Sequence, residues 1–92
     1  MKLSPTMLTA IKTIRAAGGE AHPEMGGWWR SAPVPGGHRL SWPSANYPGQ
    51  QDMLVTQTIH SLIKRGLLVK IEGQGNRLHS AYRLTAAADS IT

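Results

Sequence analysis

The sequence contains no cysteine, which excludes disulfide bonds, zinc–cysteine sites, iron–sulfur clusters and thiol catalysis. It also lacks long apolar runs, since none is longer than four residues, and this predicts that no segment spans a membrane. No apolar stretch follows the opening Met1-Lys2-Leu3, so we expect a cytoplasmic protein without a signal peptide. The 92 residues are enough for a single domain, 1–92, with one modest core.

Acidic residues are scarce. Five Asp and Glu face ten Lys and Arg, which gives a formal net charge of +5 at pH 7. A basic excess favours a polyanionic partner such as nucleic acid, although ordinary solubility charge explains it equally well. The apolar fraction of 40% is that of a folded chain, so we expect no extensive disorder.

Residues 4–17 have the pattern of an amphipathic helix. Ser4 is a good N-cap, and Pro5 suits the first helical position, where no amide donor is needed. Gly18-Gly19 is expected to end the helix. Apolar residues recur on one face between these limits, at Met7, Leu8, Ile11 and Ile14.

Residues 19–50 have poor helix propensity, because they hold six of the ten glycines, five of the six prolines and all three tryptophans. We expect an irregular insertion that starts with two short strands, 20–22 and 28–31. An ordered loop over 32–49 follows, which Trp42 and Tyr47 attach to the core. Residues 50–54 have helical propensity, which leaves open either an extension of the next helix or a separate turn.

Residues 56–66 again show helical periodicity, with Thr56 as a plausible N-cap and Gly66 at the end. Residues 67–85 predict a hairpin, since two apolar or alternating segments flank the glycine-rich turn 73–76. Residues 86–92 are expected to form a frayed tail or the first turn of a helix.

The order of parts over residues 56–85 is specific. A helix ends in Lys64-Arg65-Gly66-Leu67-Leu68, and a basic hairpin follows that closes on Tyr82-Arg83-Leu84-Thr85. This order resembles the C-terminal half of winged helix-turn-helix domains, in particular short bacterial and phage regulators of the broad MarR-like superfamily. The resemblance implies an α+β fold in which 56–66 is the recognition helix and 67–85 is the wing.

The resemblance also implies a function, and the sequence departs from the family pattern in one place. It implies double-stranded DNA as the partner and a small transcriptional or phage-related regulator, either monomer or homodimer. A second helix belongs just before the recognition helix, but residues 32–50 show no capped amphipathic pattern for one. Either a short helix lies near residues 50–54, or the insertion replaces it.

The outer face of the 56–66 helix is expected to contact DNA. Glutamine can hydrogen-bond adenine, serine and threonine suit thymine or phosphate, and lysine and arginine suit phosphate. A solvated helix face without function is the alternative. The candidate residues are Thr56, Gln57, Thr58, His60, Ser61, Lys64 and Arg65.

The hairpin supplies a second set of candidates. An arginine at a glycine-flanked tip can enter a narrow minor groove, and an outward-facing strand arginine can contact phosphate. An ordinary polar turn is the alternative. The candidate residues are Gln74, Asn76, Arg77, His79 and Arg83.

A protein-binding module is the second functional hypothesis. Exposed aromatic residues beside an arginine are typical of protein interfaces. Because adjacent strand residues face opposite ways, we expect one of the paired tryptophans to lie in the core instead. The candidates are Trp28, Trp29, Arg30, Trp42 and Tyr47.

No motif predicts a cofactor, a metal or catalysis. No nucleophile elbow, phosphate-binding loop or paired carboxylates occur, so we expect no enzyme. The histidines are too far apart in the sequence for a compact metal site: His22, His38, His60 and His79.

Overall fold

The first helix begins and ends at its capping residues. In the computed structural model, which describes residues 2–91, α1 spans Pro5–Ala16. The Ser4 hydroxyl accepts a hydrogen bond from the Met7 amide at 3.2 Å. At the other end, the Gly19 amide donates to the Ile14 carbonyl at 2.8 Å. α1 therefore occupies the range that the sequence predicts.

The other two helices are shorter. α2 spans Thr56–Lys64, and its N-cap is Val55, which makes no side-chain capping bond, so the prediction of Thr56 as the cap is wrong by one residue. α3 spans Ala86–Asp89, which is the single turn of helix left open for residues 86–92; residue 92 lies outside the described residues. In the part of the chain that the structure describes, no helix is both long and apolar enough to cross a membrane.

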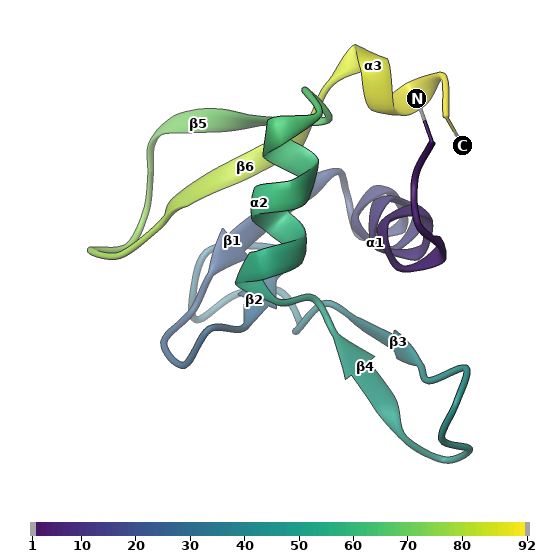
Figure 1. Cartoon of the computed structure of the whole chain (residues 1–92). Coiled ribbons are helices and arrows are strands. Elements are labelled where there is room, and N and C mark those ends of the chain that lie inside the picture. The colour runs from purple at the N-terminus through teal and green to yellow at the C-terminus, as the bar shows by residue number, and fades with distance from the viewer. Residues whose placement is uncertain (1, 92) are drawn as a thin grey trace.

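Four antiparallel strands form the main sheet, in the order β2-β1-β6-β5 (Figure 1). β1 is Glu20–Pro23 and β2 is Trp29–Arg30, and these two strands form a ribbon. β5 is Leu68–Gly75 and β6 is Ser80–Leu84; together they form the C-terminal hairpin. The sheet thus joins a strand near the start of the chain to the last strand.

A second hairpin, separate from the main sheet, lies between β2 and α2 in the sequence. β3 (Ser41–Pro43) pairs with β4 (Gln51–Met53), and Figure 1 shows this hairpin projecting near the start of α2. The insertion is therefore less irregular than predicted, and residues 50–54 are not helical. The reason is cross-strand pairing, which overrides local helix propensity once Trp42 lies opposite Asp52. Within residues 2–91, no helix lies between α1 and α2.

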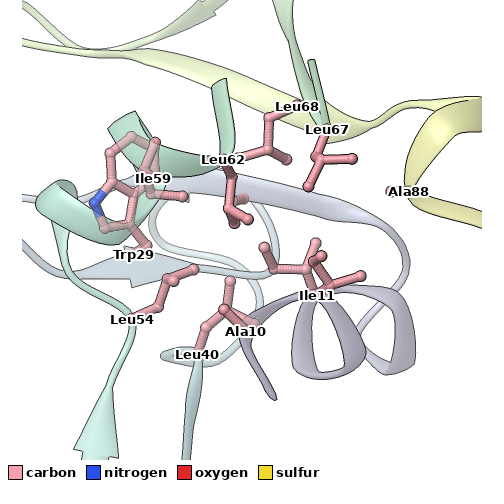
Figure 2. Packing of buried hydrophobic residues seen from close by; sticks show 12 residues of the cluster. Ala10, Ile11, Trp29, Leu40, Leu54, Ile59, Leu62, Leu67, Leu68 and Ala88 are labelled. Carbon is pink, nitrogen blue, oxygen red and sulfur yellow. The ribbon is translucent and has the colours of Figure 1, made fainter. Parts of the chain in front are cut away.

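The core lies where α1, α2 and the main sheet meet (Figure 2). Ile11 and Ile14 of α1, and Ile59 and Leu62 of α2, are completely buried. The base of the β3–β4 hairpin is anchored in the same core by two leucines from the flanking loops, Leu40 and Leu54. The result is a small α+β fold of three helices and antiparallel sheets.

Candidate nucleic-acid interface

The outer face of α2 carries polar side chains. Ile59 and Leu62 are buried and define the inner face of the helix, and α2 contains no acidic residue. The opposite face is solvent-accessible, as a helical period of 3.6 requires. It brings together an uncharged hydrogen-bonding set and one cation: Gln57, His60, Ser61 and Lys64.

Three other candidates from this helix segment lie away from the outer face. Thr56 accepts a hydrogen bond on its hydroxyl from the indole Nε1 of Trp29 at 3.2 Å, so it is turned toward the core. The Arg65 guanidinium donates to the Ser61 carbonyl at 3.0 Å and so lies back along the helix. Thr58 is half-buried on the flank between the two faces.

The two faces of the C-terminal hairpin carry different residues. Leu68 and Leu84 pair on the core side of the sheet. Since side chains alternate along a strand, Lys70 lies on the same face as Leu68, the side on which α2 packs. Arg83 pairs with Val69 and lies on the opposite face, away from α2. Arg83 is exposed and points outward, as the sequence predicts, although it does not share a face with α2. The sequence interpretation missed Lys70, which alternation from Leu68 could have found.

The turn of the C-terminal hairpin lies later in the sequence than the positions of the glycines predict. β5 continues to Gly75, and residues 76–79 form the turn in place of 73–76. The Asn76 side-chain oxygen accepts hydrogen bonds from the amides of Leu78 and His79, each at 2.9 Å. Asn76 therefore holds the turn together, and its carboxamide oxygen is already engaged.

Gly75 is required by the geometry of this hairpin end. Its φ is +121°, and a Cβ there would lie 2.5 Å from the His79 carbonyl oxygen. Just before it, Gln74 is exposed in a bulge where the β5–β6 register shifts. Arg77 is exposed within the turn itself. Gln74 and Arg77 thus lie at the solvent-exposed end of the hairpin, as predicted.

Two histidines connect α2 to the C-terminal hairpin. The imidazole of His60 lies 6.3 Å from that of His79, measured between ring centroids. His79 also lies 5.8 Å from the ring of Trp29 in the core. The helix and the hairpin thus meet in one continuous surface. In residues 2–91, no group of three or more His, Asp or Glu comes together in a way that could hold a metal ion.

Three of the candidate protein-interface residues are already engaged inside the molecule. Trp29 is 1% exposed and belongs to the core, which confirms that one of the two adjacent tryptophans is buried. Arg30 donates to two loop carbonyls, at 3.1 and 2.8 Å. Trp28 lies under the guanidinium of Arg39, whose central carbon is 5.3 Å from the ring centroid.

The other two candidates belong to the β3–β4 hairpin. Trp42 is half-buried against the core. Tyr47, in the loop that joins the two strands, is 63% exposed. Among these five residues, Tyr47 therefore offers the largest exposed fraction to a partner.

Glu24 is clamped between two arginines. Its side chain is 12% exposed, and its carboxylate oxygens accept hydrogen bonds from Arg39 and, at 3.3 Å, from Arg30. The hydrogen bond from Arg39 is the main reason that the pKa of Glu24 is lowered, and Arg30 acts in the same direction while burial opposes both. This clamp ties the turn after β1 to the loop after β2.

A lowered carboxyl pKa stabilises the fold at neutral pH and is lost on acidification. Because the unfolded chain titrates near 4.5, the stabilisation from Glu24 is complete above that pH and disappears as the pH falls through the lower folded-state pKa. We expect Glu24→Gln to cost about 1–2 kcal/mol near pH 7 and progressively less as the pH falls below 4.5. Urea unfolding across this pH range tests it, with the exposed Glu72→Gln as control; a pH-independent cost at Glu24 would contradict the prediction.

Comparison with known proteins gave no match: no family model, no curated protein and no solved structure is similar to this chain.

Proposed function

We propose that the protein binds double-stranded DNA, with α2 in the major groove and the C-terminal hairpin against the neighbouring backbone. The outer face of α2 carries this proposal. It combines uncharged groups able to address base edges, Gln57, His60 and Ser61, with Lys64 for a phosphate. A helix of this kind fits the major groove.

The cations of the C-terminal hairpin support the same surface. Lys70 lies on the side of α2, and Arg77 is exposed at the hairpin end. Neither has an ion-pair partner among the described residues, and both are therefore available to a polyanion. Together with Lys64 they provide three positive charges around an uncharged centre.

The topology supports a winged-helix arrangement. α2 leads directly into the C-terminal hairpin, and β1 lies beside β6, which lies beside β5, as in a three-stranded sheet with a wing. The departure is the β3–β4 hairpin, which occupies the place of the positioning helix. In this proposal the hairpin takes over that role through Leu40 and Leu54, since both are anchored in the core beside α2. A small transcriptional or phage-related regulator, monomeric or dimeric, would use such a surface.

A salt series on random duplex DNA tests the proposal. Three phosphate contacts predict that log affinity falls with log salt concentration with a slope of about −3. Fluorescence anisotropy of a labelled duplex, titrated between about 50 and 200 mM salt, measures this slope. No binding at the lowest salt concentration, or an affinity independent of salt, would contradict DNA binding by this surface.

Protein binding is the second candidate, and Tyr47 is the observation that favours it. An aromatic residue exposed at the end of a projecting hairpin is typical of a contact residue at an interface. The burial of Trp29 and the engagement of Arg30 leave this candidate with a smaller surface than the sequence implies. Retention of a partner from nuclease-treated lysate, lost in Tyr47→Ala, would support it.

A further inference from the structure

The main sheet forks on the side away from α3. β1 pairs with β6 through Glu20 and Ala21, whereas His22 and Pro23 pair with β2. The β1–β2 ribbon therefore separates from the C-terminal hairpin beyond Ala21. A cavity of about 540 Å³ is lined by both ribbons, and its size is that of a small-molecule site.

Two large apolar side chains line this cavity while remaining exposed to water. Met25, in the turn after β1, is 76% exposed, and Val34, in the loop after β2, is 60% exposed. Exposed apolar residues on both sides of one hollow lower the free energy of binding an apolar group there. The flexible thioether chain of Met25 can also adapt to the shape of a ligand.

The charged groups in the wall of the cavity are already paired with one another. Glu24 is bound by Arg30 and Arg39, and Arg30 also donates to two loop carbonyls. A charged ligand would have to compete with these contacts and would lose its own hydration. The cavity wall therefore favours an uncharged ligand.

One ring nitrogen of a histidine in the wall lacks a hydrogen-bond partner among the described residues. His22 is 3% exposed, and its Nε2 lies 2.7 Å from a carboxylate oxygen of Glu20. When Nε2 donates to that oxygen, the neutral imidazole has an acceptor at Nδ1. Nδ1 is buried and accepts no hydrogen bond from the residues that the structure describes. A buried acceptor without a donor is costly, so a ligand donor that reaches Nδ1 gains free energy.

The opposite wall is the end of β5 and the start of the turn, where glycines alternate with polar residues: Gly73, Gln74, Gly75 and Asn76. The β5–β6 register shifts between Ile71 and Gly75, so residues 72–74 stand outside the ladder. A Cβ at Gly73 would meet nothing within 4 Å, which shows open space beside the chain. The absence of a side chain at Gly73 therefore leaves the cavity unfilled on this side.

We propose that this cavity binds a small, uncharged amphiphilic molecule, whose apolar body lies between Met25 and Val34 and whose hydrogen-bond donor satisfies His22. An aromatic primary amide or alcohol has this chemistry. The site is separate from the outer face of α2, although one wall belongs to the C-terminal hairpin that the proposed function places against DNA. The proposal does not rest on the proposed function, since none of its observations involves DNA.

Three probes of the same size but different charge test this proposal on the full chain. We expect benzamide to shift the backbone amide resonances of Gly73 and Gly75, and the imidazole nitrogen resonances of His22, in a saturable manner by NMR. Benzoate and benzylammonium should bind at least about tenfold more weakly, since their charges meet no free partner. Absence of saturable shifts with benzamide, or stronger binding of either charged probe, would overturn the proposal.

A matched pair of variants locates the site. Met25→Glu adds a charge at the rim of the cavity, and we expect it to weaken benzamide binding about tenfold or more. Tyr47→Glu adds the same charge to another exposed residue, on the β3–β4 hairpin, and should leave binding unchanged. Because both side chains are exposed, we expect the amide resonances of residues far from each substitution to stay unchanged, which would show a preserved fold. Equal losses in the two variants, or none at Met25, would show that benzamide binds elsewhere and overturn the assignment.

Discussion

Trp29→Ala is expected to remove most of the free energy of unfolding of this domain at 25 °C. The indole is 1% exposed and packs beside Ile59 and Leu54 in the core, as Figure 2 shows. Removing a buried tryptophan costs about 3–5 kcal/mol. A domain of this size has a total stability near the lower end of about 5–15 kcal/mol, so little would remain. Far-UV circular dichroism during urea unfolding measures the loss.

Two substitutions at neighbouring residues test whether burial of the Trp29 indole causes this loss of stability. Trp28→Ala removes the same side chain one residue earlier, where it is half-buried under Arg39, and should cost about 1 kcal/mol. Thr56→Ala removes only the hydrogen-bond partner of the Trp29 indole and should also cost about 1 kcal/mol. If Trp29→Ala unfolded at the same urea concentration as either control, the assignment of Trp29 to the core would be wrong.

The double variant Lys64→Ala, Arg77→Ala is expected to bind duplex DNA roughly 50-fold more weakly at 0.1 M salt. At this concentration each counterion released by a phosphate contact contributes nearly tenfold to affinity, and two contacts are removed. The slope of log affinity against log salt should become shallower by about 2. Both side chains are exposed, so stability should change little. Anisotropy titrations at several salt concentrations measure both quantities.

A control with the same change in net charge separates position from total charge. Lys2 and Lys12 are exposed near and on α1. Lys2→Ala, Lys12→Ala lowers the formal charge by the same two units as the variant above. We expect this control to lose less than about threefold in affinity, because distant exposed charges are largely screened. Equal losses in the two double variants would mean that overall charge attracts the duplex and that α2 and the C-terminal hairpin do not form the interface.

Local signals in the sequence predicted the two main helices well. The limits of α1 depend on Ser4, Pro5 and the Gly18-Gly19 pair, and each acts within one turn of the helix end. The outer face of α2 follows from the spacing of Ile59 and Leu62 alone. These features need no knowledge of the rest of the chain.

Features that depend on distant partners could not be predicted in the same way. Residues 50–54 have helical propensity, but β4 forms because β3 pairs with it across a loop. The contact between His60 and His79 joins residues that nothing in the sequence connects. Lys70 is an intermediate case, since the buried Leu68 two residues earlier gave enough information to assign its face.

The pairing of β1 with β6 has a consequence for synthesis of the protein. Glu20 lies opposite Arg83, so a strand made early must wait for the last strand before the main sheet can form. Until then, the apolar face of α1 has no sheet to cover it, and the growing chain exposes Ile11 and Ile14 to water. Such nonlocal pairing slows folding and exposes apolar surface meanwhile. The main sheet of this domain can therefore be completed on the ribosome only after β6 has emerged.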